Sequence, residues 1–428
     1  MLNVLDQPRY KCALAAMQTV QSIPGALPIL HSGPGCASKL NDNSGSGGHF
    51  APNAYPCSLV SEKEVVFGGI KKLRNTVENA LKVMDAELFV VISGCTTEII
   101  GDDIQEVAEE FFTLEKPVVW AKTPGFKGNN YLGHDWILKS IFEQYLPKLG
   151  AATKIKGLVN IFAGTPEHDP FWLGNLHELE RLVESIGLIP NTIFGAGRSL
   201  ENIKKIRQAE YTILVSPWVG TESAEYLEKA FDIPLLKYPV LPIGAFETTK
   251  FLRAAGDFCN ADKEKVEKVI KENEEEYYYY LERFADTILE TRLLGKRFTV
   301  ASEAQYALAI TKFLVNDLGS FPLTQFITDD TPEKYRDAIK AEFNNLNYDI
   351  HADVEWTTDG KDIENKIRGF DFAGIPLIAG SSWEKNIAKE LGARYVNISY
   401  PVIDRLIINS SIAGYSGALK LLEDIYTA

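Results

Sequence analysis

Three cysteines of the first hundred residues lie in contexts that suit metal binding. Cys36 ends the segment HSGPGC directly after an apolar run, Cys95 ends SGC after another, and Cys12 precedes a stretch typical of a helix. Small residues beside a cysteine let the backbone approach a bulky inorganic ligand and point its amides at sulfur. Thiolates are the usual ligands of iron–sulfur clusters, so Cys12, Cys36 and Cys95 are candidate ligands. A set of three is incomplete unless a partner supplies the rest.

Other interpretations of the cysteines stay open at this point. A free cysteine taken singly often behaves as a small buried hydrophobe. Zinc is the alternative metal, but the chain has no CxxC pair, and His31 is the nearby imidazole to consider. Cys57 follows a loop at 41–56 rich in Gly, Ser, Asn and Pro. It is a candidate fourth metal ligand that we expect to be accessible but poorly anchored, whereas Cys259 is not expected to be a ligand.

Common catalytic motifs are absent from the sequence. It contains neither a GxxxxGK[ST] phosphate loop nor a GxSxG nucleophile elbow. The pair Gly195 and Gly197 lacks the third glycine of a dinucleotide fingerprint and predicts a strand-to-helix turn. We expect Glu98, Asp102 and Asp103 to lie at helix N-termini, where they favour the helix dipole and fix the Cys95 loop. No catalytic residue is therefore predicted in this chain.

The elements that must position the cysteines follow a regular alternation. Short apolar runs alternate with longer amphipathic segments such as 104–112, which is the pattern of βαβ units in parallel sheets covered by helices. Ligands of such folds bind near the carboxyl ends of the strands, where the Cys36 and Cys95 loops begin. The predicted strands are residues 27–31, 88–93 and 118–121; 156–162, 211–216 and 234–238; and 297–301, 322–327, 375–379 and 395–398.

This alternation restarts twice, which predicts an α/β protein of three successive units. We expect one long, charged helix over 261–293, with solvated acids and with the tyrosines 277–280 at a domain junction. The predicted domains are an N-terminal α/β domain with the cluster cysteines at 1–150, a second at 151–260, the linking helix at 261–295, and a third with a C-terminal helix at 296–428.

The composition excludes several classes of protein. The 428 residues are 45% hydrophobic, and 44 Lys and Arg against 58 Asp and Glu give a net charge of −14, so no basic face is expected for nucleic acid. No apolar run is long enough to span a membrane, and no secretion signal is recognised. Five cysteines are too few for a disulfide framework and favour a reducing, cytoplasmic location.

The order of these motifs resembles the nitrogenase component 1 family. The spacing of Cys12, Cys36 and Cys95 is close to that of the family's P-cluster cysteines, and CTTEIIGDD follows the same pattern. Further similar segments cover nearly the whole chain: VFGG at 66–69, TPGF at 123–126, the PxGxxxTxxFL-like segment at 242–252, YPVIDR at 400–405 and GYSGA at 414–418. Several of these resemble the β-type, or K-type, subunit of the family.

The resemblance implies a fold, a cofactor and partners. The fold is three Rossmann-like domains, each a parallel sheet flanked by helices. The cofactor is an iron–sulfur cluster, P-cluster-like 8Fe–7S or 4Fe–4S, that Cys12, Cys36 and Cys95 share with an α-like (D-type) subunit in an α2β2 assembly. An ATP-dependent iron–sulfur reductase, similar to the Fe protein, feeds electrons in, and the α-like subunit holds the catalytic metallocofactor.

Departures from the β-type pattern limit what the resemblance implies about the reaction. Gly125 stands where β subunits of the family carry a serine that can ligate the oxidised P-cluster, and HSGPGC and the segment at 61–69 are closer to the α-type. This mixture suits a nitrogenase-like reductase, of which methylthio-alkane reductase is one kind. The alternatives are a scaffold for metallocofactor assembly and a cluster-free α/β protein that binds a small molecule.

Overall fold

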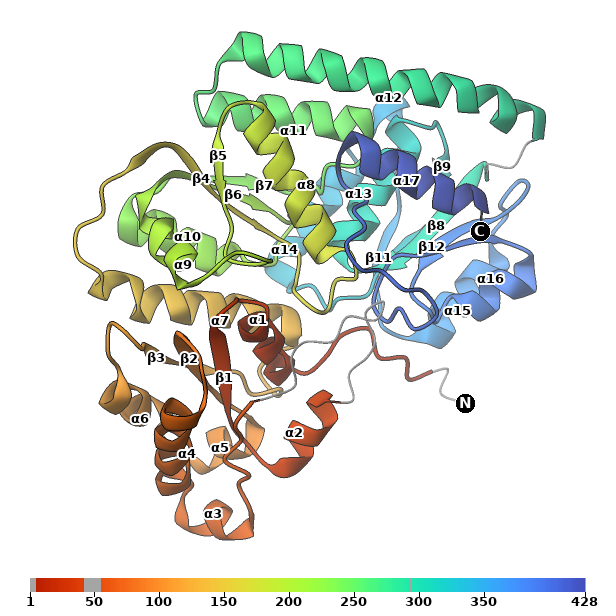
Figure 1. The fold of residues 1–428 in the computed structure, drawn as a ribbon. Coiled ribbons are helices and arrows are strands. Elements are labelled where there is room, and N and C mark those ends of the chain that lie inside the picture. The colour runs from red at the N-terminus through yellow and green to blue at the C-terminus, as the bar shows by residue number, and fades with distance from the viewer. Residues whose placement is uncertain (1–4, 42–54, 292–294, 428) are drawn as a thin grey trace.

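The chain folds into three parallel β-sheets, each flanked by helices, in a computed structural model that describes residues 5–41, 55–291 and 295–427. All pairings between its named strands are parallel. The first sheet occupies one end of the molecule, and the second and third sheets lie at the other end (Figure 1). The predicted α/β class with three helix-flanked parallel sheets is confirmed.

The first sheet, of order β1-β2-β3, carries the cysteine loops. Its strands are β1 (Ala26–His31), β2 (Leu88–Ser93) and β3 (Val118–Lys122). Its helices are η1 (Ala13–Ala16), α1 (Met17–Gln21), α2 (Pro34–Asn41), α3 (Glu62–Phe67), α4 (Ile70–Val83), α5 (Cys95–Ile100), α6 (Ile104–Phe111), α7 (Asn130–Gln144) and η2 (Leu146–Lys148). Ile29 and Val91 pack in one apolar cluster with residues of α4 and α6, whereas Leu30 and Ile92 pack in another with residues of α1 and α7. Both faces of the strands are thus buried, which explains their continuous apolar sequences.

The second sheet has the order β5-β4-β6-β7. Three of its strands were expected from the sequence, whereas the three-residue β5 was not. The strands are β4 (Ile155–Ala163), β5 (Ile189–Asn191), β6 (Ala209–Val215) and β7 (Leu235–Tyr238). The helices are α8 (Trp172–Ser185), α9 (Leu200–Lys205), η3 (Ile206–Gln208), α10 (Thr221–Phe231) and α11 (Gly244–Phe258). Gly195 and Gly197 have positive φ angles between β5 and α9, as expected for a turn.

The third sheet has the order β11-β10-β8-β12-β13, and β9 also pairs with β8. Its strands are β8 (Arg297–Ser302), β9 (Phe321–Pro322), β10 (Gln325–Ile327), β11 (Val354–Trp356), β12 (Leu377–Gly380) and β13 (Arg394–Asn397). Its helices are α13 (Ala304–Asn316), α14 (Glu333–Phe343), η4 (Asn347–Asp349), α15 (Gly360–Gly369), α16 (Lys385–Leu391) and α17 (Gly414–Thr427). The prediction of one strand over 322–327 is wrong, because the Gln325 side chain accepts a hydrogen bond from Val300 N at 2.9 Å and interrupts the main-chain ladder.

The long charged helix is α12 (Lys263–Thr291), which runs along the outside of the molecule and packs against α11 and α17 (Figure 1). Val266, Ile270 and Tyr277 face the core, and the Tyr277 hydroxyl donates to Asp317 Oδ1 at 3.2 Å. Tyr278–Tyr280 are exposed. Only the first tyrosine of the run is therefore buried. None of the helices in the described ranges combines the length and apolar character that crossing a bilayer requires.

Candidate functional site

Cys12 and Cys95 meet at Gly125. The Gly125 amide donates a hydrogen bond to Cys95 Sγ at 3.1 Å. A Cβ atom built on Gly125 would lie 2.4 Å from Cys12 Sγ and 3.5 Å from Cys95 Sγ. Two cysteines that are far apart in the sequence therefore place their sulfur atoms beside one glycine, and a side chain at this position would overlap the Cys12 sulfur.

Cys12 is held by contacts on both sides of it. Its main chain forms an antiparallel bridge with Asn129, and Lys11 N donates to Asn130 Oδ1 at 2.7 Å. The residue as a whole is exposed, but loss of water around its sulfur raises the pKa of the thiol. The neighbouring Cys95 and Cys36 sulfurs raise this pKa further, whereas a hydrogen bond from the Leu14 amide lowers it in part. The sulfur atoms of Cys36 and Cys95 are therefore close enough to influence the ionisation of Cys12.

The segment before Cys12 crosses from the first sheet to the third. We call residues 5–11 the N-terminal strap. Arg9 is buried and forms an ion pair with Glu384 at 2.6 Å, and Trp383 Nε1 donates to the Pro8 carbonyl at 3.0 Å. The position of Cys12 therefore depends on contacts made by residues near the other end of the chain.

Cys95 and Cys36 follow neighbouring strands of the first sheet. Cys95 is the first residue of α5, and Thr97 Oγ1 donates to the His31 carbonyl at 2.8 Å, which ties α5 to the end of β1. A Cβ atom on Gly94 would lie 2.4 Å from Ser32 Oγ, so the two strand ends touch closely at this glycine. Cys36 lies in α2 and is exposed.

Cys57 is better anchored than the sequence suggested. Residues 42–54, most of the loop that precedes it, lie outside the described ranges. Cys57 itself forms a parallel bridge with Leu30, and the flanking hydrogen bonds, Leu30 N to Pro56 O and Ser58 N to Leu30 O, measure 2.8 and 2.9 Å. It is half-buried. The expectation of a poorly anchored residue is therefore wrong, because this segment extends the sheet beyond β1.

His31 and Asp102 form a buried network that the sequence analysis did not predict. His31 Nε2 lies 2.9 Å from Asp102 Oδ2, and His31 Nδ1 lies 2.8 Å from Ser58 Oγ. Asp102 also accepts from Gly69 N at 2.9 Å. Burial lowers the pKa of His31 and Asp102 raises it in part, so the imidazole is neutral at neutral pH. Both ring nitrogens have partners, which removes His31 as a zinc ligand.

The acids after Cys95 have three different roles. Asp103 caps α6 as predicted, because its side chain accepts from the amides of Gln105 and Glu106. Asp102 lies at a helix N-terminus as expected, but at that of α4, from whose N-cap amide, Gly69 N, it accepts a hydrogen bond, and it fixes the Cys95 loop through His31. Glu98 accepts from Ser93 Oγ at 2.5 Å. The expectation that these residues are structural therefore agrees with their contacts, although Asp102 serves α4 and not the helix that follows it.

The lining of this thiol site fits an inorganic sulfur-rich group. Ser32 is fully buried, and its Oγ has no hydrogen-bond partner among the described residues. An unpaired buried hydroxyl is costly, and this one lies against Gly94, directly before Cys95. Within residues 5–41, 55–291 and 295–427, no three His, Cys, Asp or Glu side chains come close enough to share one metal ion. The thiols are instead spread over a surface around Gly94 and Gly125.

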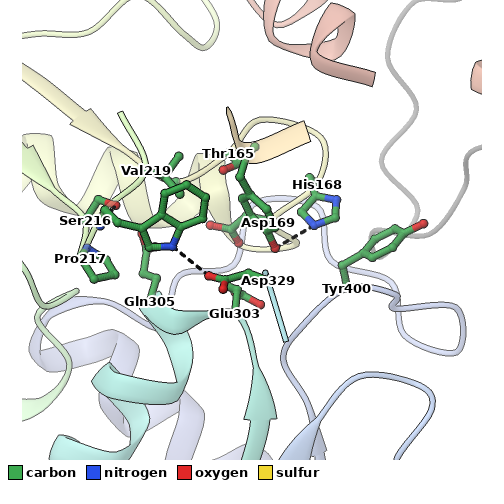
Figure 2. A pocket seen from close by; sticks show the side chains of 13 residues that line it. Thr165, His168, Asp169, Ser216, Pro217, Val219, Glu303, Gln305, Asp329 and Tyr400 are labelled. Atoms are coloured by element: carbon green, nitrogen blue, oxygen red, sulfur yellow. Dashed lines mark hydrogen bonds between the residues drawn. The ribbon is translucent and has the colours of Figure 1, made fainter. Parts of the chain in front are cut away.

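A second polar site lies where the strands of the second and third sheets end (Figure 2). It is a cavity of about 20 Å³, with room for about one water-sized group. Burial raises the pKa of Asp169 to about 7 and that of Glu303 to about 8. Trp218 Nε1 donates to Asp329 Oδ2 at 3.0 Å, and His168 Nε2 lies 2.9 Å from the Tyr131 hydroxyl. Polar residues directly after β4, β6, β8 and β10 are the sequence signal for this cavity. They were not predicted as a site, because the cysteines alone were considered as ligands.

Cys259 lies apart from these sites, buried at the C-terminal end of α11. Burial raises the pKa of its thiol to about 12. This environment agrees with the expectation that it is not a ligand.

Comparisons with known proteins point in one direction. A sequence profile of the family described as nitrogenase component 1 type oxidoreductase matches residues 12–428. The nitrogenase molybdenum–iron protein beta chain of Rippkaea orientalis is 26% identical over 96% of this chain and 81% of its own length. That of Clostridium pasteurianum is 23% identical over 96% of this chain and 90% of its own. A solved structure described as "Nitrogenase Cp1 at pH 6.5" superposes with a TM-score of 0.79, at 22% identity over 99% of this chain and 93% of that one, which shows a shared fold.

Proposed function

Because this chain belongs to the nitrogenase component 1 type oxidoreductases, we propose that it is the β-like subunit of a nitrogenase-like reductase and holds an iron–sulfur cluster at its boundary with an α-like subunit. Cys12, Cys36 and Cys95 are the proposed ligands, with further thiolates from the partner in an α2β2 assembly. Such a cluster, 4Fe–4S or P-cluster-like 8Fe–7S, supplies single-electron transfer between an ATP-dependent iron–sulfur reductase and a metallocofactor in the α-like subunit.

The observation that carries this proposal is the convergence of sulfur atoms at Gly125. Cys12 Sγ and Cys95 Sγ both lie next to this residue, and its amide donates to Cys95 Sγ. Amide hydrogen bonds to sulfur stabilise thiolates and tune the potential of iron–sulfur sites. Cys12 and Cys36 are exposed, as the ligands of a group shared with a second subunit would be in the isolated chain.

Residues around the thiols hold them in place. The neutral His31 and the Asp102 carboxylate tie the end of β1, the Cys95 loop and Gly69 together. The N-terminal strap fixes Cys12 through the buried Arg9–Glu384 ion pair. These buried contacts fix the segments that carry the thiols, which is what a site with a defined electron-transfer geometry requires.

An apolar surface beside the thiol site supports docking of the reductase. Phe67 is 82% exposed and Val66 72% exposed at the end of α3, and Ile99 is 74% exposed on α5, against which α3 packs. Isolated exposed apolar residues are ordinary, but three of this size on adjoining helices mark an interaction surface. We assign this docking surface, defined as Val66, Phe67 and Ile99, to the reductase because it adjoins the Cys95 helix and thus shortens the path of the electron.

The substrate site is assigned to the partner subunit. The cavity at the junction of the second and third sheets has a volume of about 20 Å³, too little for a substrate-sized molecule. None of its lining residues in the described ranges is a cysteine. The small volume argues against the cluster-free alternative only where it would place the small molecule in this cavity.

The proposal is tested by purifying the chain anaerobically with its partner and measuring iron and sulfide per heterodimer. We expect Cys95→Ala and Cys36→Ala to lose iron and the EPR signal of the reduced complex, and the buried control Cys259→Ala to retain both. Unchanged iron and EPR in the first two variants would refute the cluster assignment. A complex that transfers its metallocofactor to another protein and reduces no substrate with its reductase would replace the relay with an assembly scaffold.

A further inference from the structure

Three large aliphatic side chains in the segment between β13 and α17 face solvent. Ile403 is 68% exposed, Leu406 70% and Ile408 69%. Ile407, which lies between the last two, is buried. The segment is thus apolar on its outer face as well as on its inner face. Single exposed apolar residues are ordinary, but a group of three this close in sequence marks an interaction surface. We call Ile403, Leu406 and Ile408 the aliphatic surface.

Polar and packing contacts hold both ends of this segment in place. Ile403 N donates to Ser382 Oγ at 3.0 Å, and Asp404 Oδ1 accepts from the same hydroxyl at 3.1 Å. At the other end, the Ser410 carbonyl packs closely against α8, because a Cβ atom built on Gly174 would overlap it. A segment that is already ordered loses little conformational entropy when a partner binds. The aliphatic side chains are therefore presented to a partner in a fixed arrangement.

The turn that fixes this segment also fixes the N-terminal strap. The turn comprises residues 381–384, directly after β12. Ser382 contacts the segment of the aliphatic surface, whereas its neighbour Trp383 donates to the Pro8 carbonyl of the strap. Adjacent side chains of one turn thus link the aliphatic surface to the strap that leads to Cys12. In Figure 1 the dark blue segment before α17 accordingly reaches the region of the strap.

The distances involved are small compared with a protein–protein interface. Cys12 follows Pro8 by four residues, and an extended chain spans at most about 3.3–3.6 Å per residue, so Cys12 lies within about 15 Å of this contact. A stable interface buries about 800 Å² on each partner, the area of a disc about 30 Å across. A partner that covers the exposed Cys12 with an interface of ordinary size is therefore large enough to cover the aliphatic surface as well.

The surface assigned to the reductase lies in another part of the molecule. Its residues Val66 and Phe67 belong to α3, which lies beyond the first sheet at one end of the molecule (Figure 1). The aliphatic surface adjoins the third sheet, at the other end. Two separate apolar surfaces fit two different partners, and the one linked to the strap fits the partner that shares the cluster.

We propose that the aliphatic surface is buried by the α-like subunit, within the same interface as the shared cluster. The inference rests on the proposed function and deepens it, because it names the part of this chain that the partner recognises. Burial of the three aliphatic side chains supplies affinity, whereas the thiolates supply the cluster. The partner is thus bound chiefly through apolar contacts of the third sheet's domain, and the cluster ligands are brought together by that contact.

The test is binding of the full chain to its tagged α-like subunit under anaerobic conditions, by co-purification and by titration of the dissociation constant. We expect Leu406→Asp and Ile408→Asp to weaken binding at least about tenfold, because each places an unpaired charge in an apolar contact. Val83→Asp is the control, since Val83 is equally exposed but ends α4, away from the strap. All three replace exposed residues, so their urea unfolding midpoints should match that of the wild type.

Three outcomes would overturn the inference. They are wild-type affinity in both Leu406→Asp and Ile408→Asp, an equal loss of affinity in Val83→Asp, and disruption of a homo-oligomer of this chain by Leu406→Asp with partner binding intact, which would assign the surface to a second copy. In each case, iron in the heterodimer that is lost in Cys95→Ala leaves the proposed function standing. A wild-type chain that binds no α-like subunit contradicts both the inference and the proposed function.

Discussion

Replacing Gly125 with alanine is the most direct test of the thiol geometry. The new methyl group would lie 2.4 Å from Cys12 Sγ and 3.5 Å from Cys95 Sγ. Non-bonded heavy atoms settle at about 3.5–4.0 Å, so the Cys12 sulfur has to move by about 1 Å while Cys95 can stay. Rotation of a surface cysteine relieves most of the overlap, and we expect the free energy of unfolding to fall by no more than about 1 kcal/mol, the low end for overpacking.

The consequence for metal binding is larger than the consequence for stability. Metal ligands have to be placed within about 0.5 Å of their productive position, so a displacement of about 1 Å in one of the ligands lowers the iron content. Iron and sulfide per heterodimer and urea unfolding midpoints measure the two effects separately. Gly369→Ala is the control, because a Cβ on Gly369 meets no atom within 4 Å and the residue lies at the end of α15, beside the third sheet. Wild-type iron content in Gly125→Ala would refute the argument that Cys12 ligates from this position.

Three further predictions follow from the described contacts. Asp102→Asn removes the carboxylate that holds His31 and Gly69, and we expect it to lower the free energy of unfolding, measured in urea, by about 1–3 kcal/mol. Asp103→Asn keeps a residue that can cap α6, so it should change this free energy little. Equal losses in the two variants would contradict the role assigned to Asp102. Burial raises the pKa of Glu303 from 4.5 to about 8, so between these pH values the folded chain holds a proton that the unfolded chain releases. The contribution of this group to the free energy of unfolding therefore falls as the pH rises from 4.5 to about 8. Glu303→Gln should flatten that part of the pH profile, and an unchanged slope would count against a protonated Glu303. Because Phe67 is exposed, Phe67→Ser should leave the iron content and the unfolding midpoint unchanged. It should weaken electron delivery by the reductase, measured as the steady-state rate of substrate reduction by the complex. An undiminished rate would remove the docking surface from the proposal.

Much of the fold was predictable because parallel strands buried on both faces have an unmistakable pattern. The runs ending at His31 and Ser93 were placed to within one residue, since helices cover each sheet face and leave no polar alternation. The three-residue β5 and β11 were not predicted, because they are too short to carry a periodicity of their own. Gln325 interrupts a predicted strand through its side chain, a tertiary effect that no local pattern reveals.

The candidate site was predictable in its residue types but not in its supporting contacts. Cysteines at strand ends indicated where a cluster would lie, and the nearness of Cys12 and Cys95 agrees with that expectation. The partnership of His31 with Asp102 depends on residues distant in sequence and on burial that removes water from both. The anchoring of Cys57 was misjudged because the composition of the preceding loop says nothing about the sheet pairing that follows it.

The N-terminal strap ties the order of synthesis to the order of maturation. Cys12 leaves the ribosome well before Trp383 and Glu384, yet these two residues supply the indole hydrogen bond and the ion pair that fix its segment. The strap therefore reaches its final position only after the third sheet has emerged and folded, whereas the bridge between Cys12 and Asn129 can form earlier. Fragments that end before Trp383 would lack both contacts that hold the strap, so the surroundings of the proposed ligand Cys12 are completed only when the third sheet is in place.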